Sequence, residues 1–138
     1  MSLTNVWVQT RGDGVVRADQ VVGIDTHQTP ALTGKPARWL LDVVLPTTIG
    51  SGARDGWGVT ALHRTLTQTT EDPAGAPAAL ARLLAQLDHV NAAGIIAVST
   101  DSTPDSPLGG EELSTRVRFR FVPFTSPDPG HYTGAEYL

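Results

Sequence analysis

The sequence has no cysteine, which excludes a disulfide framework, a zinc site built from thiolates and a cysteine nucleophile. Lysine is almost absent as well, because every basic residue except Lys35 is arginine. Acidic residues outnumber basic ones by 14 to 10, which gives a formal net charge of -4. This balance argues against nucleic acid as a general partner, since proteins that bind the phosphate backbone carry a clear excess of Lys and Arg.

Long apolar runs are also missing. Runs such as Trp39–Leu41, Val43–Leu45 and Ile95–Val98 reach only three or four residues, far short of the roughly 20 residues that a membrane-spanning helix needs. The N-terminus shows no basic region followed by an apolar run, so no secretory signal is expected. The arginine skew, together with abundant Ala, Gly and Pro, indicates a bacterial genome rich in G and C. We therefore expect a bacterial cytoplasmic protein without a membrane partner.

What the chain does contain is enough apolar material for one core. It has 138 residues, of which 40% are apolar, and this suits one domain with its own core but is too short for two ordinary ones. Pro127, Asp128, Pro129 and Gly130 then introduce a distinct end segment. We predict a single domain over residues 1–124 and an extended tail over 125–138.

The clearest local signal is the alternation of arginine and apolar residues from Arg116 to Phe121. A period of two places the arginines on one face of a strand and the apolar side chains on the other. We expect the apolar side to face inward, beneath a helix, and the arginine side to face solvent.

The first part of the chain predicts a hairpin. Val6–Thr10 is rich in residues that favour a strand, and Gly12 and Gly14 suit a tight reversal. The return limb runs toward Ile24, with residues 18–20 expected to form a bulge or bend.

The middle of the chain predicts two further strands. The segment 38–45 is apolar on both faces, so we place it centrally in a sheet and expect Pro46 to end it. Residues 46–58 are expected to form a polar loop because they contain several glycines. The segment 57–70 fits either a helix or a strand, and its β-branched threonines favour a strand.

The only helix that the sequence predicts runs over about 76–92. Leu80, Leu83, Leu84 and Leu87 recur on one helical face, and Pro77 suits the first turn. Ile95–Val98 then reads as a core strand, and 99–114 as a surface loop. Together these elements predict an α+β domain with a mainly antiparallel sheet of about five to six strands and the helix packed on one face.

Asp25 and His27 form one candidate site, because alternate residues of a strand point the same way and this pair suits a metal or a base with its orienting group. His63 and Asp42 are on other predicted strands and would complete a cluster only if the fold brought them together. His and Asp side chains scattered at strand ends are usually polar groups that face solvent, so no metal and no cofactor is predicted here. Asp25, His27 and His63 are the residues that a catalytic function would use.

A second candidate is the face of Arg116, Arg118 and Arg120, whose side chains would stand about 7 Å apart along a strand. Such a row suits an anionic ligand, a nucleic-acid strand or an acidic partner. The alternative is a solvated sheet face, whose arginines pair with neighbouring carboxylates and protect a sheet edge. In the tail, Tyr132 and Tyr137 are candidate anchors for a partner.

The sequence carries no catalytic signature. It lacks a G-x-S-x-G elbow, and its glycine-rich segments lack the lysine of a phosphate loop. Three functions remain open. The first is a non-catalytic interaction or assembly module that self-associates or binds another protein. The second is a binding domain for an anionic ligand or nucleic acid that uses the arginine face. The third is a small metal-dependent enzyme.

Overall fold

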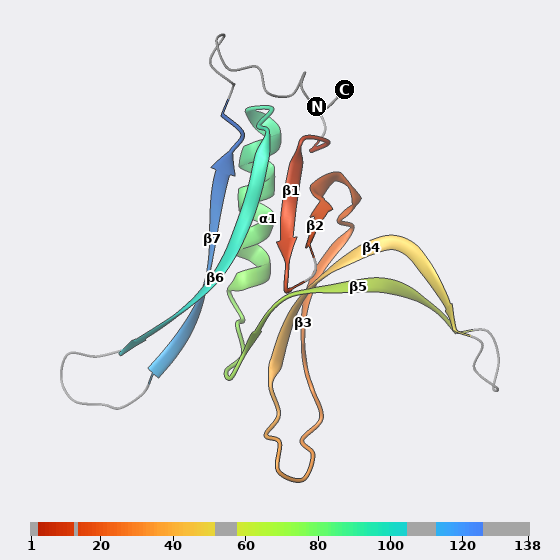
Figure 1. Cartoon of the computed structure of the whole chain (residues 1–138), viewed down its shortest axis with the longest axis vertical. Coiled ribbons are helices and arrows are strands. Elements are labelled where there is room, and N and C mark those ends of the chain that lie inside the picture. The colour runs from red at the N-terminus through yellow and green to blue at the C-terminus, as the bar shows by residue number, and fades with distance from the viewer. Residues whose placement is uncertain (1–2, 13, 52–57, 105–112, 126–138) are drawn as a thin grey trace.

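The computed structural model describes residues 3–12, 14–51, 58–104 and 113–125. Within these residues the chain forms seven strands, one α-helix and a short 3-10 helix (Figure 1). In chain order they are β1 (Val6–Thr10), β2 (Gly14–Arg17), η1 (Ala18–Gln20), β3 (Gly23–Gln28), β4 (Trp39–Ser51), β5 (Gly58–Thr69), α1 (Ala76–His89), β6 (Gly94–Pro104) and β7 (Leu113–Pro123). The predicted α+β class with one helix and mainly antiparallel strands is confirmed.

The strands form two sheets rather than the single sheet that the sequence suggested, and they number slightly more than predicted. Sheet A has the order β2-β1-β6-β7, and sheet B has the order β3-β4-β5. All neighbouring strands are antiparallel except β1 and β6, which pair in parallel through Val6–Gly94, Trp7–Ile95 and Val8–Ile96. Helix α1 lies between β5 and β6 in sequence, so the chain leaves sheet B, forms the helix and returns to the middle of sheet A.

The β1–β2 hairpin forms as predicted. Gly12 and Gly14 both have a positive φ, 77° and 126°, the conformation that only glycine adopts at little cost. Residues 18–20, predicted as a bulge or bend, form the 3-10 helix η1 instead. The backbone N–H of Arg11, in the turn, donates to the Thr65 carbonyl at 2.9 Å and so ties this hairpin to sheet B.

Helix α1 ends three residues earlier than predicted. Asn91 has a φ of 52°, which falls in the left-handed region and is incompatible with helix continuation. Three leucines of the predicted stripe, Leu80, Leu84 and Leu87, are buried, whereas Leu83 is half-buried at the margin. The helix contacts both β3 and β7, so it covers parts of both sheets (Figure 1).

Strand β4 is central in sheet B, as predicted, but the prediction that Pro46 ends it is wrong. The strand continues to Ser51, and its pairing with β5 shifts register between Leu45 and Thr48. This irregularity accommodates a proline, because a residue outside the regular ladder has no hydrogen bond to lose. Within the segment 57–70, Gly58–Thr69 forms strand β5, as predicted, and residue 57 lies outside the described residues.

The predicted loop 99–114 is also wrong in part, because Ser99–Pro104 belongs to β6 and Leu113 and Ser114 belong to β7. Residues 105–112 lie outside the described residues. The hairpin pairs continuously from Gly94–Pro123 to Pro104–Leu113. Figure 1 shows it curving away from the rest of the molecule, while the end of the β4–β5 hairpin projects in another direction.

The core lies between the two sheets and the helix. Its fully buried side chains come from all three: Val6, Val8 and Ile96 of sheet A, Leu41 and Val43 of sheet B, and Leu80 of α1. Val117, Phe119 and Phe121 of β7 pack against this core, which confirms the predicted orientation of that strand. Among the described residues no helix is long and apolar enough to span a membrane.

Candidate functional site

The outward face of sheet B carries a histidine–aspartate cluster made of Asp25, His27, Asp42 and His63. Asp25 and His27 are two residues apart on β3, Asp42 is on β4 and His63 is on β5. The register places Asp25 directly opposite Asp42, while Val44 lies opposite His63. Alternate residues of a strand share a face, so the neighbours of Asp42 along β4, Leu41 and Val43, point into the core instead.

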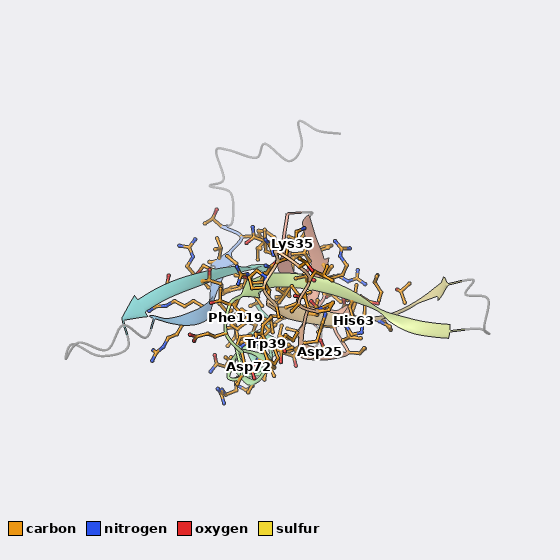
Figure 2. All side chains as sticks on the ribbon, turned by 90° about the horizontal axis from the view of Figure 1, so that it is seen from below. Asp25, Lys35, Trp39, His63, Asp72 and Phe119 are labelled. Carbon is orange, nitrogen blue, oxygen red and sulfur yellow. The ribbon has the colours of Figure 1, made fainter. Side chains whose placement is uncertain are left out.

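Asp42 is the centre of this cluster. Its Oδ2 lies 3.3 Å from His27 Nδ1 and 3.7 Å from His63 Nδ1. The same nitrogen of His63 lies 3.7 Å from Asp25 Oδ2, and Figure 2 shows the labelled Asp25 and His63 side by side. The two imidazole rings meet at an interplanar angle of 86° with their centroids 6.4 Å apart. Asp42 therefore faces the imidazoles of both neighbouring strands, and Asp25 faces that of His63.

The cluster has a buried floor and an open rim. The side chain of Asp42 is 2% exposed, whereas those of Asp25, His27 and His63 are 46%, 49% and 43% exposed. Within the described part of the chain, Asp42 Oδ1 is buried without a hydrogen-bond partner, and so is Asp25 Oδ1. An unsatisfied buried acceptor costs about 1–3 kcal/mol, and more when it is charged. The two carboxylates are also cross-strand neighbours, and two like charges in such positions destabilise the sheet.

From the sequence, Asp25 and His27 were expected to form a pair. His63 and Asp42 were expected to join this pair only if the fold placed them next to it. The structure brings all four together. What sequence reasoning missed is the central role of Asp42. The available signal was a charged residue in the middle of the apolar strand Trp39–Leu45, because a carboxylate in a buried strand requires a partner.

Three kinds of chemistry suit this arrangement. A carboxylate beside an imidazole can orient a histidine that acts as a base. Two carboxylates beside two imidazoles can form ion pairs when the histidines are protonated. Asp25, His27 and Asp42 also each place one ligand atom within 4.8 Å of the others, as a bound metal ion requires.

The arginine row, made of Arg116, Arg118 and Arg120, forms the second candidate site. All three side chains are exposed on β7, as predicted. Arg118 Nε pairs with Asp101 Oδ2 on β6 at 2.5 Å, so the row is partly a cross-strand ion pair of the kind that a solvated sheet face contains. A surface pair of this kind contributes little stability, about 0–1 kcal/mol.

The arginine row borders a hollow at the start of α1. Arg116 and Arg118 line it together with Gly75 and Ala76, and its volume is about 410 Å³. Asp72 lines the same hollow, so an acidic side chain offsets the positive charge that the arginines bring. The predicted tail anchors Tyr132 and Tyr137 lie outside the described residues.

Each sheet ends in a ribbon of only two strands. The β6–β7 ribbon runs from the pair Ala97–Arg120 to the pair Pro104–Leu113, because β1 pairs with β6 no further than Ile96. The β4–β5 ribbon runs from Leu45–Leu62 to Ser51–Gly58, because β3 pairs with β4 no further than Val44. At about 3.4 Å per residue the β6–β7 ribbon is roughly 24 Å long.

Comparisons with models of known protein families, with curated proteins and with solved structures find no match to this chain. Function therefore has to be argued from the cluster, the arginine row and the ribbons themselves.

Proposed function

We propose that the protein is a self-associating assembly module in which the β6–β7 ribbon of one copy binds a second copy. The observation that carries the proposal is the length over which this ribbon continues after its last hydrogen-bonded pairing with a third strand, that of β1 with β6. Isolated two-stranded ribbons are marginal in water, and three or more strands or packing against another element give stability. Val98, Val117 and Phe119 pack the base of the ribbon against the core, and a second copy would supply the additional packing for its outer part.

The backbone of β7 suits such an interaction. It is an edge strand of 11 residues, and the unpaired N–H and C=O groups along an edge strand are a template for another chain. Addition of a strand at such an edge provides backbone hydrogen bonds for affinity, while side chains on alternate positions select the partner.

The charge distribution supports a second copy as the partner. Three of the ten basic residues are in the arginine row, while the whole chain carries 14 acidic residues. With Asp101 paired to Arg118 and Asp72 nearby, the row is a weakened positive patch on a negative molecule, and complementary charges favour its contact with the acidic surface of another copy.

The same row argues against one geometry. If two β7 edges paired with each other about a two-fold axis, the arginines of both copies would lie on the same face, opposite or diagonal to one another. Like charges in these positions are destabilising. We therefore infer that β7 binds a different surface of the neighbouring copy.

The first prediction concerns size in solution. Light scattering coupled to size-exclusion chromatography is expected to give a mass that is a multiple of 14.6 kDa and that falls on dilution. The substitution Arg120→Glu is expected to shift the protein toward the monomer, because it reverses one positive charge of the arginine row. Arg120 is exposed and lies at the end of the row that is closest to the core. High salt is expected to weaken the assembly of the wild type, since exposed charges are screened.

The matched control is Arg82→Glu, which makes the same charge change at an exposed position of α1 and is expected to leave the mass unchanged. A second control removes residues 130–138. It shows whether the ribbon or the tail is the segment through which the copies associate. A wild type that is monomeric at all concentrations would overturn the proposal. An oligomer that only the tail deletion dissociates would move the interface to the tail.

The alternative of an anionic ligand bound by the arginine row stays a prediction from the sequence. Asp101 and Asp72 beside Arg118 and Arg116 make the site less positive than the sequence pattern suggested. Self-association uses the same arginines together with the ribbon, and so it accounts for more of the structure.

A further inference from the structure

We propose that the histidine–aspartate cluster on sheet B binds one divalent transition-metal ion, for which zinc is the best fit. Asp25, His27 and Asp42 supply three ligands, and His63 supplies the fourth. This inference goes beyond the proposed self-association and does not depend on it, because the cluster and the β6–β7 ribbon are on different sheets.

The first argument is the spacing of the ligand atoms. Zinc binds histidine nitrogen and carboxylate oxygen at about 2.0–2.2 Å in a tetrahedron, so ligand atoms around zinc lie roughly 3.3–3.6 Å apart. The separations from Asp42 Oδ2 to His27 Nδ1 and to His63 Nδ1 are 3.3 and 3.7 Å. The separation from Asp25 Oδ2 to His63 Nδ1 is also 3.7 Å. At 3.7 Å a nitrogen and an oxygen are too far apart for a hydrogen bond but within a few tenths of an ångström of a zinc coordination shell.

The second argument is the buried, unpartnered carboxylate. The side chain of Asp42 is 2% exposed, and its Oδ1 has no hydrogen-bond partner among the described residues. Asp25 lies directly opposite it in the register, so two like charges face each other across neighbouring strands and repel. A divalent cation between the two carboxylates would give a neutral site and would remove this repulsion.

The third argument concerns the identity of the ion. Two imidazoles beside two carboxylates favour zinc and its transition-metal neighbours, whereas Mg²⁺ and Ca²⁺ select oxygen ligands. The half-exposed side chains of Asp25, His27 and His63 form the rim of the site, so an ion has a path from solvent to Asp42. Because the ligands come from three adjacent strands, a bound ion would also link β3, β4 and β5.

The experiment uses the full chain with any affinity tag removed, after treatment with a chelator and dialysis. Co²⁺ is titrated while its visible absorption is recorded, and Zn²⁺ is then added to displace it. We expect one ion per chain and an absorption intensity typical of four-coordinate Co²⁺. Asp42→Asn and His27→Gln are each expected to weaken binding by at least about tenfold, the lower end of the loss seen even for outer-sphere partners. His63→Gln is expected to weaken binding and to change the Co²⁺ spectrum.

His89→Gln is the matched control, because His89 is exposed at the end of α1 and lies outside the cluster; its affinity is expected to equal that of the wild type. Two results would overturn the proposal: binding weaker than millimolar, or an affinity that neither Asp42→Asn nor His27→Gln changes. His27 is half-exposed, so His27→Gln is expected to fold even if Asp42→Asn does not.

Thermal unfolding separates a metal site from a simple pair of Asp–His ion pairs. If the cluster binds metal, Asp42→Asn is expected to unfold at the same or a higher temperature than the wild type in chelator, because one of two opposed carboxylates is gone. Zn²⁺ is then expected to raise the unfolding temperature of the wild type and not that of the variant. If Asp42→Asn is the less stable protein in chelator and Zn²⁺ stabilises neither, the cluster consists of ion pairs and the metal proposal is wrong.

Discussion

At the scale of single residues, the role of a side chain depends on its neighbours on adjacent strands more than on its neighbours in the sequence. Asp42 is buried although it points to the outward face of sheet B, because His27 and His63 from the neighbouring strands cover it. Gly94 is a second such residue. Gly94 is the first residue of β6, after the chain leaves α1, and the backbone of the adjacent strand β7 lies very close to it.

The space around Gly94 leads to a prediction about the substitution Gly94→Ala. A Cβ at this position would meet the Val122 carbonyl oxygen at a distance that real Cβ atoms do not adopt, and it would lie 2.7 Å from Pro123 Cα. Both are backbone atoms, so β7 would have to move. We expect a loss of about 1–3 kcal/mol in the free energy of unfolding, the usual cost of overpacking, measured by urea denaturation.

Gly75→Ala is the matched control for that substitution. Gly75 precedes α1 with a φ of -85°, and a Cβ there would meet nothing within 4 Å. We expect this variant to be neutral or more stable by up to about 1 kcal/mol, because alanine restricts the unfolded chain. Equal stability of the two variants would contradict the close approach of β7 to Gly94.

At the scale of elements, α1 joins the two sheets and its leucines are not equivalent. Leu80 is fully buried on a helix that contacts both β3 and β7, whereas Leu83 packs at the margin of the core. Leu80→Ala is expected to reduce the free energy of unfolding by about 2–5 kcal/mol, the range for a buried leucine. Leu83→Ala is expected to cost clearly less, because solvent already reaches this side chain. Denaturant unfolding of both variants would test the order, and a larger loss for Leu83→Ala would contradict it.

The elements that the sequence predicted correctly are those with a strong period of their own. Leu80, Leu84 and Leu87 define α1, and the alternation from Arg116 to Phe121 defines β7. Two of the errors lie where pairing overrides composition. Pro46 stands in an irregular part of the β4–β5 ladder, and the polar residues of Ser99–Pro104 are in a strand because β7 supplies their backbone partners. Sequence periodicity contains no information about such a partner.

At the scale of the whole molecule, the division into two sheets and the position of the cluster follow from non-local pairing. Asp42 follows Asp25 by 17 residues and His63 follows Asp42 by 21, and only the registers of β3, β4 and β5 bring them together. A sequence reading could place Asp25 and His27 on one face of a strand, because the period of a strand is local. It had no means to place Asp42 between two imidazoles.

The architecture of a core with two projecting ribbons leads to a final prediction, for hydrogen exchange. In a monomer the outer backbone groups of the ribbons are open to water, and such segments exchange from low-energy openings. If the β6–β7 ribbon binds a second copy, the amides of residues 100–104 and 113–117 are expected to exchange more slowly in the concentrated wild type than in the dissociated Arg120→Glu variant. Mass spectrometry of peptic fragments measures this difference.

The internal reference for that measurement is the core. Val6, Val8 and Ile96 are fully buried in sheet A, so fragments of β1 and of the start of β6 are expected to exchange at the same rate in both proteins. The β4–β5 ribbon contains no residue of the arginine row. If its amides also exchange more slowly in the assembled protein, this ribbon is the surface that binds β7 of the other copy. Equal exchange of the β6–β7 ribbon in the assembled and dissociated protein would exclude it from the interface, because an edge strand paired with another chain cannot leave its amides as accessible as before.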